Sequence, residues 1–206
     1  MDMLLFLLAF ASFNPHNVIE VRKTQFLNVV SDIVIIAESD SITLSYYWKS
    51  GLDKYRINVE KIGETPYYLI YDSENLWKVI KKEKKKELVS FLELANLWIY
   101  NWFNYLPKDF KWKRGEEGFA ILEYDHENAK INLWIDSDGI IKKVKIDSEF
   151  REMDIEYTDF MDIKDFTGYP KSWVTRCDGI EKEFEVRIKR INQKFCTPCT
   201  FKIPPY

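Results

Sequence analysis

Glycine, histidine and cysteine are scarce in this chain, and each shortage excludes a class of site. Only 7 of the 206 residues are glycine, and they form none of the clusters that Rossmann and P-loop nucleotide sites need. The 2 histidines, His16 and His126, and the cysteines match no standard zinc pattern, because the one close cysteine pair has no second pair. A Ser-His-Asp arrangement is not indicated either. The sequence therefore predicts no cofactor, no metal site and no catalytic site.

The chain also lacks a strong net charge and a long apolar run. Its formal net charge is −3, so no basic field indicates a nucleic-acid partner. The apolar run at residues 3–11, MLLFLLAFA, is too short to span a bilayer as a helix. It has the length of a signal-peptide core, and Ala9-Phe10-Ala11 fits the A-x-A cleavage rule, but the positive charges that normally precede such a core are missing. We expect residues 1–16 to be a signal peptide, with a buried N-terminal segment as the alternative.

Aromatic residues, by contrast, are abundant. They make up 16% of the chain, which favours a β-rich fold with a large apolar interior or cavity. Hydrophobic residues at 46% and charged residues at 31% are typical of a globular protein and not of a disordered one. Residues 17–206 are long enough to form one domain with a sizeable core.

The most informative stretch is residues 66–82, PYYLIYDSENLWKVIKK. Two apolar runs flank a short polar loop, Asp72-Ser73-Glu74-Asn75, and this pattern predicts a β-hairpin. A sheet with one face in water should be polar at every second position, but large side chains occur here on both faces. The second face therefore needs a covering partner, which we expect to be a helix, another subunit or a lipid.

Alternating patterns predict further strands on both sides of this hairpin. Residues 17–30 instead have the spacing of a short amphipathic helix. Successive hairpins with inserted helices indicate one large, strongly curved antiparallel sheet in an α+β fold. The additional strands are predicted at residues 32–38, 42–49, 54–61, 119–124, 129–135, 140–147, 151–160, 169–176 and 180–190.

Residues 87–106, ELVSFLELANLWIYNWFNYL, are the most apolar region of the chain. Their apolar side chains recur at helical spacing and widen into a stripe that covers nearly the whole circumference, and Pro107 ends the pattern. We expect either a core helix packed across the sheet or a lid over an apolar cavity. The preceding charge run, residues 81–87, KKEKKKE, is either a solvated strand end or a docking patch for an acidic partner or anionic lipid headgroups.

The cysteines lie near the C-terminus, where Cys196-Thr197-Pro198-Cys199 forms a C-x-x-C motif. A redox motif of this type normally opens a helix after a strand, whereas the prolines here favour an extended tail. In an oxidising compartment we expect a structural bridge, either Cys196–Cys199 or Cys177 with one of them.

Several motifs resemble those of the LolA/LolB-like periplasmic lipoprotein carriers. Residues 72–79, DSENLWKV, resemble the hairpin with the L-W pair of that family, and residues 49–58, KSGLDKYRIN, are similar to its approach to the hairpin. Residues 133–144, LWIDSDGIIKKV, resemble its L-W-I-D strand and turn. Residues 157–160, YTDF, and the ending FKIPP at 201–205 also resemble family segments.

The resemblance implies one half-barrel domain over residues 17–206, an open sheet of about eleven strands with helices plugging its concave face. It implies a non-enzymatic, monomeric periplasmic carrier or chaperone whose cavity holds acyl chains of lipoproteins or lipids. The implied partners are an inner-membrane lipoprotein-release transporter and an outer-membrane acceptor. The carriers have an arginine that helps to hold the lid closed, and here Ser50-Gly51 stands in its place, which speaks against the same energy-driven cycle.

Two alternatives to the carrier remain open. One is a sensor or structural domain of the same fold with a filled core, and the other is a periplasmic thiol oxidoreductase that uses Cys196 and Cys199. The cavity-lining residues that we predict are Tyr46, Trp48, Tyr55, Ile57, Leu69, Tyr71, Trp77, Leu88, Phe91, Trp98, Trp102 and Trp134.

Overall fold

A single antiparallel sheet forms the body of the molecule. The computed structural model describes residues 32–49, 54–99, 110–114, 118–163, 166–191 and 197–206. The strands are β1 (Asp32–Ser39), β2 (Ile42–Lys49), β3 (Tyr55–Lys61), β4 (Tyr67–Tyr71), β5 (Leu76–Ile80), β6 (Lys85–Val89), β7 (Lys111–Arg114), β8 (Ala120–His126), β9 (Ala129–Ile135), β10 (Ile141–Ser148), β11 (Arg151–Ile163), β12 (Phe166–Cys177) and β13 (Ile180–Ile191).

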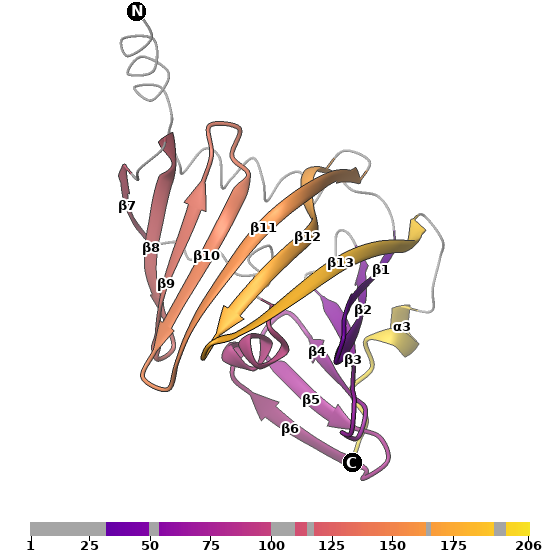
Figure 1. Ribbon diagram of the computed structural model, residues 1–206. Coiled ribbons are helices and arrows are strands. Elements are labelled where there is room, and N and C mark those ends of the chain that lie inside the picture. Colours follow the sequence, from indigo (N-terminus) through magenta and orange to yellow (C-terminus); the bar gives the residue numbers. More distant parts are fainter. Residues whose placement is uncertain (1–31, 50–53, 100–109, 115–117, 164–165, 192–196) are drawn as a thin grey trace, which may run out of the picture.

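The strands follow one another in the order β6-β5-β4-β3-β2-β1-β13-β12-β11-β10-β9-β8-β7 (Figure 1). Strands that follow one another in sequence are neighbours in the sheet, except β6 and β7, which lie at its two edges. Strand β1 pairs with β13, and two meanders meet at this seam. The sheet is open, because β6 and β7 are edges that pair with no further strand in the described part of the chain. It has 13 strands instead of the expected number of about eleven, and the described fold is mostly β.

Side chains that alternate between buried and partly exposed explain why these segments form strands and where the core lies. In β3, Tyr55, Ile57 and Val59 are fully buried while the residues between them are partly exposed. In β9, Leu133 and Ile135 are buried on the same pattern. One face of almost every strand thus contributes to one large apolar cluster. The strand pattern and the curvature predicted from the sequence are confirmed (Figure 1).

The long helix predicted at residues 87–106 is wrong in its first part. Residues Lys85–Val89 form strand β6, and a 3₁₀ helix, η1 (Phe91–Leu97), follows. Ser90 has an extended backbone, and its side chain accepts a hydrogen bond from the backbone N–H of Leu92, so the helix begins there. Trp98 adopts a left-handed conformation with φ 64° and ends η1. Residues 100–109 lie outside the described residues, as does the helix predicted at residues 17–30.

The predicted hairpin is present as β4 and β5. Asp72 organises the turn between them, because its Oδ1 accepts hydrogen bonds from the backbone N–H groups of Glu74 and Asn75. Its Oδ2 accepts a hydrogen bond from the indole N–H of Trp77 at 2.9 Å. All five residues of β4 are buried, so both faces of the hairpin are covered, as the sequence predicts.

The second face is covered by the C-terminal segment of the chain itself. Tyr68, Ile70 and Val79 form a separate small cluster, and Ile203 packs against it together with Trp77. The sequence analysis expected a helix, another subunit or a lipid at this place. A distant segment of the same chain was overlooked because no local pattern at residues 201–206 reveals where they pack.

The C-terminal segment contains a short helix, α3 (Thr197–Thr200), where the sequence analysis expected an extended tail. The Arg56 guanidinium donates a hydrogen bond to the carbonyl oxygen of Thr200, and the Lys86 ammonium donates one to that of Pro204. Cys199 is disulfide-bonded and Cys177 is free and buried, so a bridge that uses Cys177 is wrong. Cys196 lies outside the described residues.

Candidate functional site

The concave side of the sheet, which we define as the side that faces η1, is the candidate site. Figure 1 shows the sheet curving around η1, the coil that lies between β5 and the end of β12. Leu94, Ala95 and Leu97 of η1 are buried in the large apolar cluster. Among the described residues, η1 is the one helix that lies on this side, and the helical plug implied by the family resemblance stays a prediction.

A row of aromatic rings crosses the concave side. Tyr46 stacks on Tyr55 with ring centroids 5.6 Å apart, and Tyr55 contacts Tyr71 at 5.2 Å. Tyr71 meets Phe91 of η1 edge-on at 5.5 Å, and Phe91 in turn lies 5.4 Å from His126. Ring contacts of this type add to the free energy of burial. They connect the strands β2 to β4 with η1 and with the end of β8.

The N-terminus of η1 is held by the turn between β8 and β9. Glu127 accepts hydrogen bonds from the Ser90 hydroxyl and, at 3.1 Å, from the backbone N–H of Phe91. A carboxylate at this end of the helix satisfies N–H groups that have no partner within the helix. The adjacent His126 is buried, and burial lowers its pKa below the ordinary value of 6.5.

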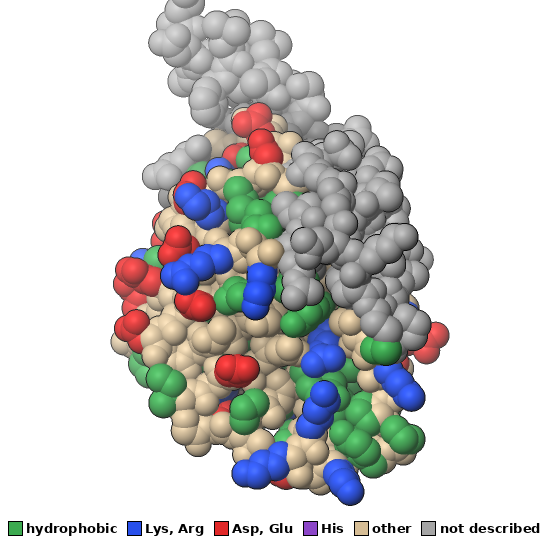
Figure 2. All heavy atoms as spheres, turned by 90° about the vertical axis from the view of Figure 1, so that its right-hand side faces the viewer, with side chains coloured by type: hydrophobic (Ala, Val, Ile, Leu, Met, Phe, Trp, Pro, Cys, Tyr) green, Lys and Arg blue, Asp and Glu red, His purple; other side chains and the backbone are tan. Residues whose placement is uncertain are grey.

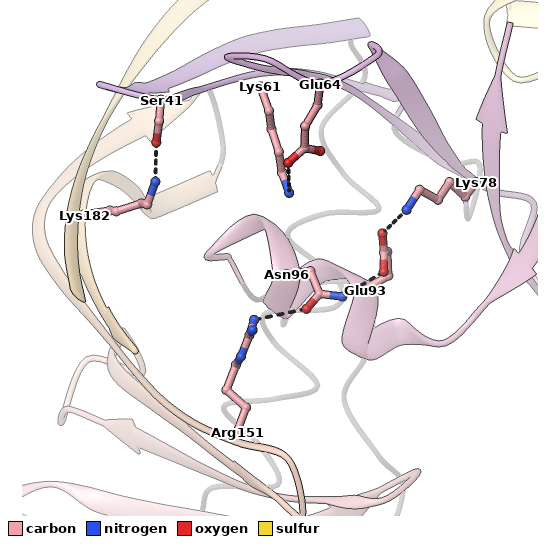
Figure 3. Close-up of polar contacts among 8 residues, drawn as sticks. All are labelled: Ser41, Lys61, Glu64, Lys78, Glu93, Asn96, Arg151 and Lys182. Carbon is pink, nitrogen blue, oxygen red and sulfur yellow. Dashed lines mark hydrogen bonds and ion pairs between the residues drawn. The ribbon is translucent and has the colours of Figure 1, made fainter. Parts of the chain in front are cut away.

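Polar contacts link η1 to both sides of the open sheet (Figure 3). Lys78 of β5 contacts Glu93 at 2.7 Å, and the Asn96 side-chain amide donates a hydrogen bond to the other Glu93 oxygen at 2.8 Å. Arg151, at the start of β11, donates a hydrogen bond to Asn96 at 3.1 Å. Arg151 also lies 3.5 Å from Asp178 in the turn that follows β12. We call this row of five residues the polar bridge.

The end of η1 is fixed to the far strands. The buried Thr175 hydroxyl donates a hydrogen bond of 2.7 Å to the carbonyl oxygen of Trp98. The Lys182 ammonium lies 4.9 Å from the centre of the Trp98 ring and also contacts the Ser41 hydroxyl (Figure 3). Both ends of η1 are therefore tied by polar contacts, while its buried side chains pack on apolar ones.

Two hollows are relevant to the site, and one of them lies beside η1. The first is a small apolar cavity of about 60 Å³. It is lined by Ile35, Ala37, Leu44, Tyr46, Ile99, Tyr157, Tyr169, Pro170, Trp173 and Val186. The second is a cleft of about 670 Å³ between η1 on one side and the β8–β9 turn, β10 and β11 on the other. It is lined by Val89, Ser90, Leu92, Glu93, Ala95, Asn96, Glu127, Asn128, Ile146, Ser148, Phe150, Arg151 and Met153.

The cleft has an apolar floor and a polar rim. Ala95, Ile146 and Met153 belong to the large apolar cluster, and Val89 and Leu92 pack against it. The rim contains charged and amide side chains, including Glu93, Asn96 and Arg151 of the polar bridge. A cleft of this kind suits an amphiphile, whose apolar part lies on the floor while its polar part stays at the rim.

Eight of the predicted cavity residues lie on the concave side. Trp77 instead packs in the small cluster on the opposite face, and Leu88 is 59% exposed. Trp134 is half-buried and lies between Leu133 and Ile135 of the large cluster, so it points to the convex face. Trp102 lies outside the described residues. The eight that the structure brings together are Tyr46, Trp48, Tyr55, Ile57, Leu69, Tyr71, Phe91 and Trp98.

The polar rim and the walls contributed by β11 to β13 were not predicted from the sequence. Tyr157 and Trp173 lie opposite each other on paired strands and line the small cavity. Their position in alternating strands was visible in the sequence, but the pairing of β1 with β13 that brings them close to Tyr46 was not. Asn96 and Arg151 carry no local signal at all, because they meet only in the folded chain.

Neither a metal centre nor a membrane-spanning helix is found in the described part of the chain. No group of three or more His, Cys, Asp and Glu side chains is placed there to hold a metal ion. None of the described helices is long and apolar enough to cross a bilayer.

Comparison with known proteins gives a likeness of fold. No family model and no curated protein sequence matches the chain. Among solved structures, a domain from Vibrio parahaemolyticus described as an outer membrane lipoprotein-sorting protein domain matches with a TM-score of 0.54. The match covers 86% of this chain and 92% of that chain at 10% sequence identity. The two chains share a fold.

The resemblance to lipoprotein-sorting proteins that the motifs indicate is thus confirmed as a likeness of fold. A second similar structure is an uncharacterized conserved protein from Thermus thermophilus. It is 10% identical, the match covers 93% of this chain and 96% of that chain, and the TM-score is 0.42.

Proposed function

We propose that this protein is an exported, non-enzymatic carrier that binds the acyl chains of lipoproteins or lipids in the cleft beside η1. The observation that carries the proposal is the apolar floor of that cleft, which continues into the large cluster of the concave side. The fold shared with a lipoprotein-sorting domain supports it. Delivery towards an outer-membrane acceptor, after loading by an inner-membrane transporter, is the cellular role that we propose for such a carrier.

The size and chemistry of the cleft agree with an acyl chain as ligand. Its volume of about 670 Å³ falls within the range of ligand pockets, about 300–1,000 Å³. Each methylene group that leaves water contributes about 0.8 kcal/mol, so an acyl chain gains affinity from the floor without any specific polar partner. Asn128 and Arg151 lie at the rim, and we propose that the rim contacts a polar headgroup or the first peptide groups of a lipoprotein.

Deeper insertion of a chain requires η1 to move. The small apolar cavity, which Ile99 helps to line, measures only about 60 Å³, which is little more than the space of one or two methylene groups. The polar bridge holds η1 to Lys78 on one side and to Arg151 on the other. The Arg151–Asn96 contact is exposed, so water replaces a lost partner there at modest cost, whereas the half-buried Lys78–Glu93 contact costs more to break. We propose that η1 swings away from the sheet when a ligand enters.

A second candidate is a sensor or structural domain of the same fold. The small volume of the apolar cavity favours it, because the concave side is then a filled core that η1 never leaves. The two functions differ in one measurable property, the uptake of an acyl chain. A thiol oxidoreductase remains a third prediction, to be tested by assaying disulfide reduction with Cys196 and Cys199 replaced.

Titration with a fluorescent fatty acid tests the carrier. We expect saturable binding to the purified protein, and we expect Leu92→Asp to weaken it at least tenfold by placing a charge on the floor of the cleft. Ile62→Asp is the matched control, because Ile62 is 80% exposed in the turn after β3 and should leave binding unchanged. Binding that is absent, or equally affected by both variants, would favour the filled core.

A further inference from the structure

The turn between β5 and β6 is a dense cluster of lysines. Residues 81–87, KKEKKKE, contain five lysines and two glutamates in a chain whose net charge is −3. Lys81, Lys82, Lys84 and Lys85 are all exposed, and Lys84 has a positive φ of 51° in the turn. The excess of positive charge at this end of the sheet is therefore local, and the rest of the molecule is acidic.

Protection of a sheet edge explains only part of this cluster. β6 is an edge strand, and lysines on such a strand prevent pairing with another chain. This accounts for Lys85 and Lys86, which lie in β6. Lys81, Lys82 and Lys84 lie in the turn, where no strand edge needs protection, and none of the three has an ion-pair partner among the described residues.

The lysines of β10, by contrast, are neutralised by acidic neighbours. Lys142, Lys143 and Lys145 of β10 contact Asp136, Asp154 and Glu152 respectively. The turn lysines thus differ from them in lacking a fixed counter-charge within the described part of the chain. Unpaired charges that repel one another are stabilised by an external anion or anionic surface.

Apolar and aromatic side chains lie beside the lysines on the convex face. Leu88, 59% exposed, is paired across the strands with Trp77, and the Lys86 ammonium lies 5.8 Å from the centre of the Trp77 ring. Tyr206 at the C-terminus is 41% exposed. Figure 2 shows hydrophobic and basic side chains intermingled over the lower part of one face, at the height of β5, β6 and the C-terminus in Figure 1.

We propose that this surface, the basic patch of Lys81, Lys82, Lys84, Lys86, Leu88 and Tyr206, docks the protein on an anionic lipid bilayer. Lysine clusters are attracted to anionic headgroups, and aromatic side chains prefer the level of the headgroups at a membrane surface. An exposed leucine between them can enter the acyl boundary while the lysines stay in the headgroup layer. An acidic protein would satisfy the lysines but would give no reason for the exposed Leu88 and the aromatic rings.

The inference is independent of acyl-chain binding, although the two are compatible. Strand β6 leads through Ser90 directly into η1, which borders the cleft. A bilayer that contacts the basic patch therefore lies near the element that we expect to move. Docking can be present in a protein that binds no acyl chain, and the reverse is also true.

Sedimentation with phospholipid vesicles tests the proposal. We expect the full-length protein to bind vesicles that contain phosphatidylglycerol, to bind pure phosphatidylcholine vesicles far more weakly, and to lose binding at high salt. Replacing Lys81, Lys82 and Lys84 together by glutamine should weaken binding by about a hundredfold, since each lysine near an anionic surface contributes about fivefold. The matched control replaces Lys113, Lys130 and Lys171, which changes the net charge equally, and should alter binding less than about threefold.

Leu88→Ser separates a lipid surface from an acidic protein. It should weaken binding to the vesicles several-fold and leave binding to polyglutamate unchanged. The proposal is overturned if the protein ignores anionic vesicles, if the two triple variants behave alike, or if polyglutamate binds while the vesicles do not. Fatty-acid uptake by the Lys81, Lys82 and Lys84 variant should be normal, so failure of docking is distinguishable from failure of the carrier function.

Discussion

The ammonium group of Lys78 lies 2.7 Å from a carboxylate oxygen of Glu93, and this contact joins the outer part of the sheet to the helix on its concave side. Both side chains are mostly buried, at 23% and 16% exposure. Glu93→Gln leaves the Lys78 charge without its partner. We expect the free energy of unfolding to fall by about 1–2 kcal/mol, between the values for exposed and for buried pairs, as measured by urea denaturation.

The pair Lys61–Glu64 is the control for this prediction. It spans 3.7 Å, and the Glu64 side chain is 57% exposed, so Glu64→Gln should change the free energy of unfolding by less than about 0.5 kcal/mol. Equal effects of the two variants would show that the Lys78–Glu93 contact does not hold η1 in place.

The pH dependence of stability should reveal the buried His126. Because burial lowers its pKa below 6.5, the folded protein keeps this imidazole neutral at a pH where the unfolded chain binds a proton. The unfolded state then binds more protons, so the free energy of unfolding decreases as the pH falls below about 6.5. Denaturation at several pH values between about 7.5 and 5.5 measures this decrease.

His126→Phe should flatten this dependence while it keeps a ring next to Phe91. Carboxylates whose pKa the fold lowers, such as Asp72 and Asp159, have ordinary values near 3.8 and so titrate below this window. An unchanged slope in the variant would assign the pH dependence to other groups.

The C-terminal segment should stabilise the hairpin that it covers. Ile203 packs on Tyr68, Ile70 and Val79, so Ile203→Ala should lower the free energy of unfolding by about 1–2 kcal/mol. Lys202 is exposed, and Lys202→Ala should have an effect below about 0.5 kcal/mol. Thermal denaturation of both variants compares the two, and a neutral Ile203→Ala would mean that the segment leaves the hairpin in solution.

Counting reactive thiols tests which cysteines are free and which are disulfide-bonded. Cys199 is disulfide-bonded, and burial raises the pKa of the free Cys177, which is only 4% exposed. We expect no rapid reaction of the native protein with a thiol reagent, one reactive thiol after denaturation without reductant, and all 3 after reduction. Two rapidly reacting thiols in the native, oxidised protein would contradict this assignment.

The hairpin shows how far the sequence alone leads. Alternation and the Asp72 turn are local properties, so β4 and β5 were predictable, and so was the need to cover both faces. The cover itself was not, because Ile203 reaches Tyr68 and Val79 across more than a hundred residues of chain. Contacts of that kind leave no periodic signal.

Residues 87–106 show why a strong pattern can mislead. Apolar side chains at helical spacing predicted one long helix, but Lys85–Val89 complete the sheet edge next to β5 instead. The hydrogen bonds that β5 offers to this segment outweigh its helical propensity. The other error was the choice of which face of a strand lines the cavity. Trp134 and Trp77 alternate with residues that face the concave side, and they therefore point to the convex face.

The most direct test of the carrier function is native mass spectrometry of the protein purified under mild conditions from cells that export it, followed by extraction and identification of whatever is bound. We predict a ligand that carries at least one acyl chain and that is lost in Leu92→Asp but retained in Ile62→Asp. A protein that is free of lipid, and that remains so after incubation with lipoprotein or fatty acid, would contradict the carrier function and leave the concave side as a filled core.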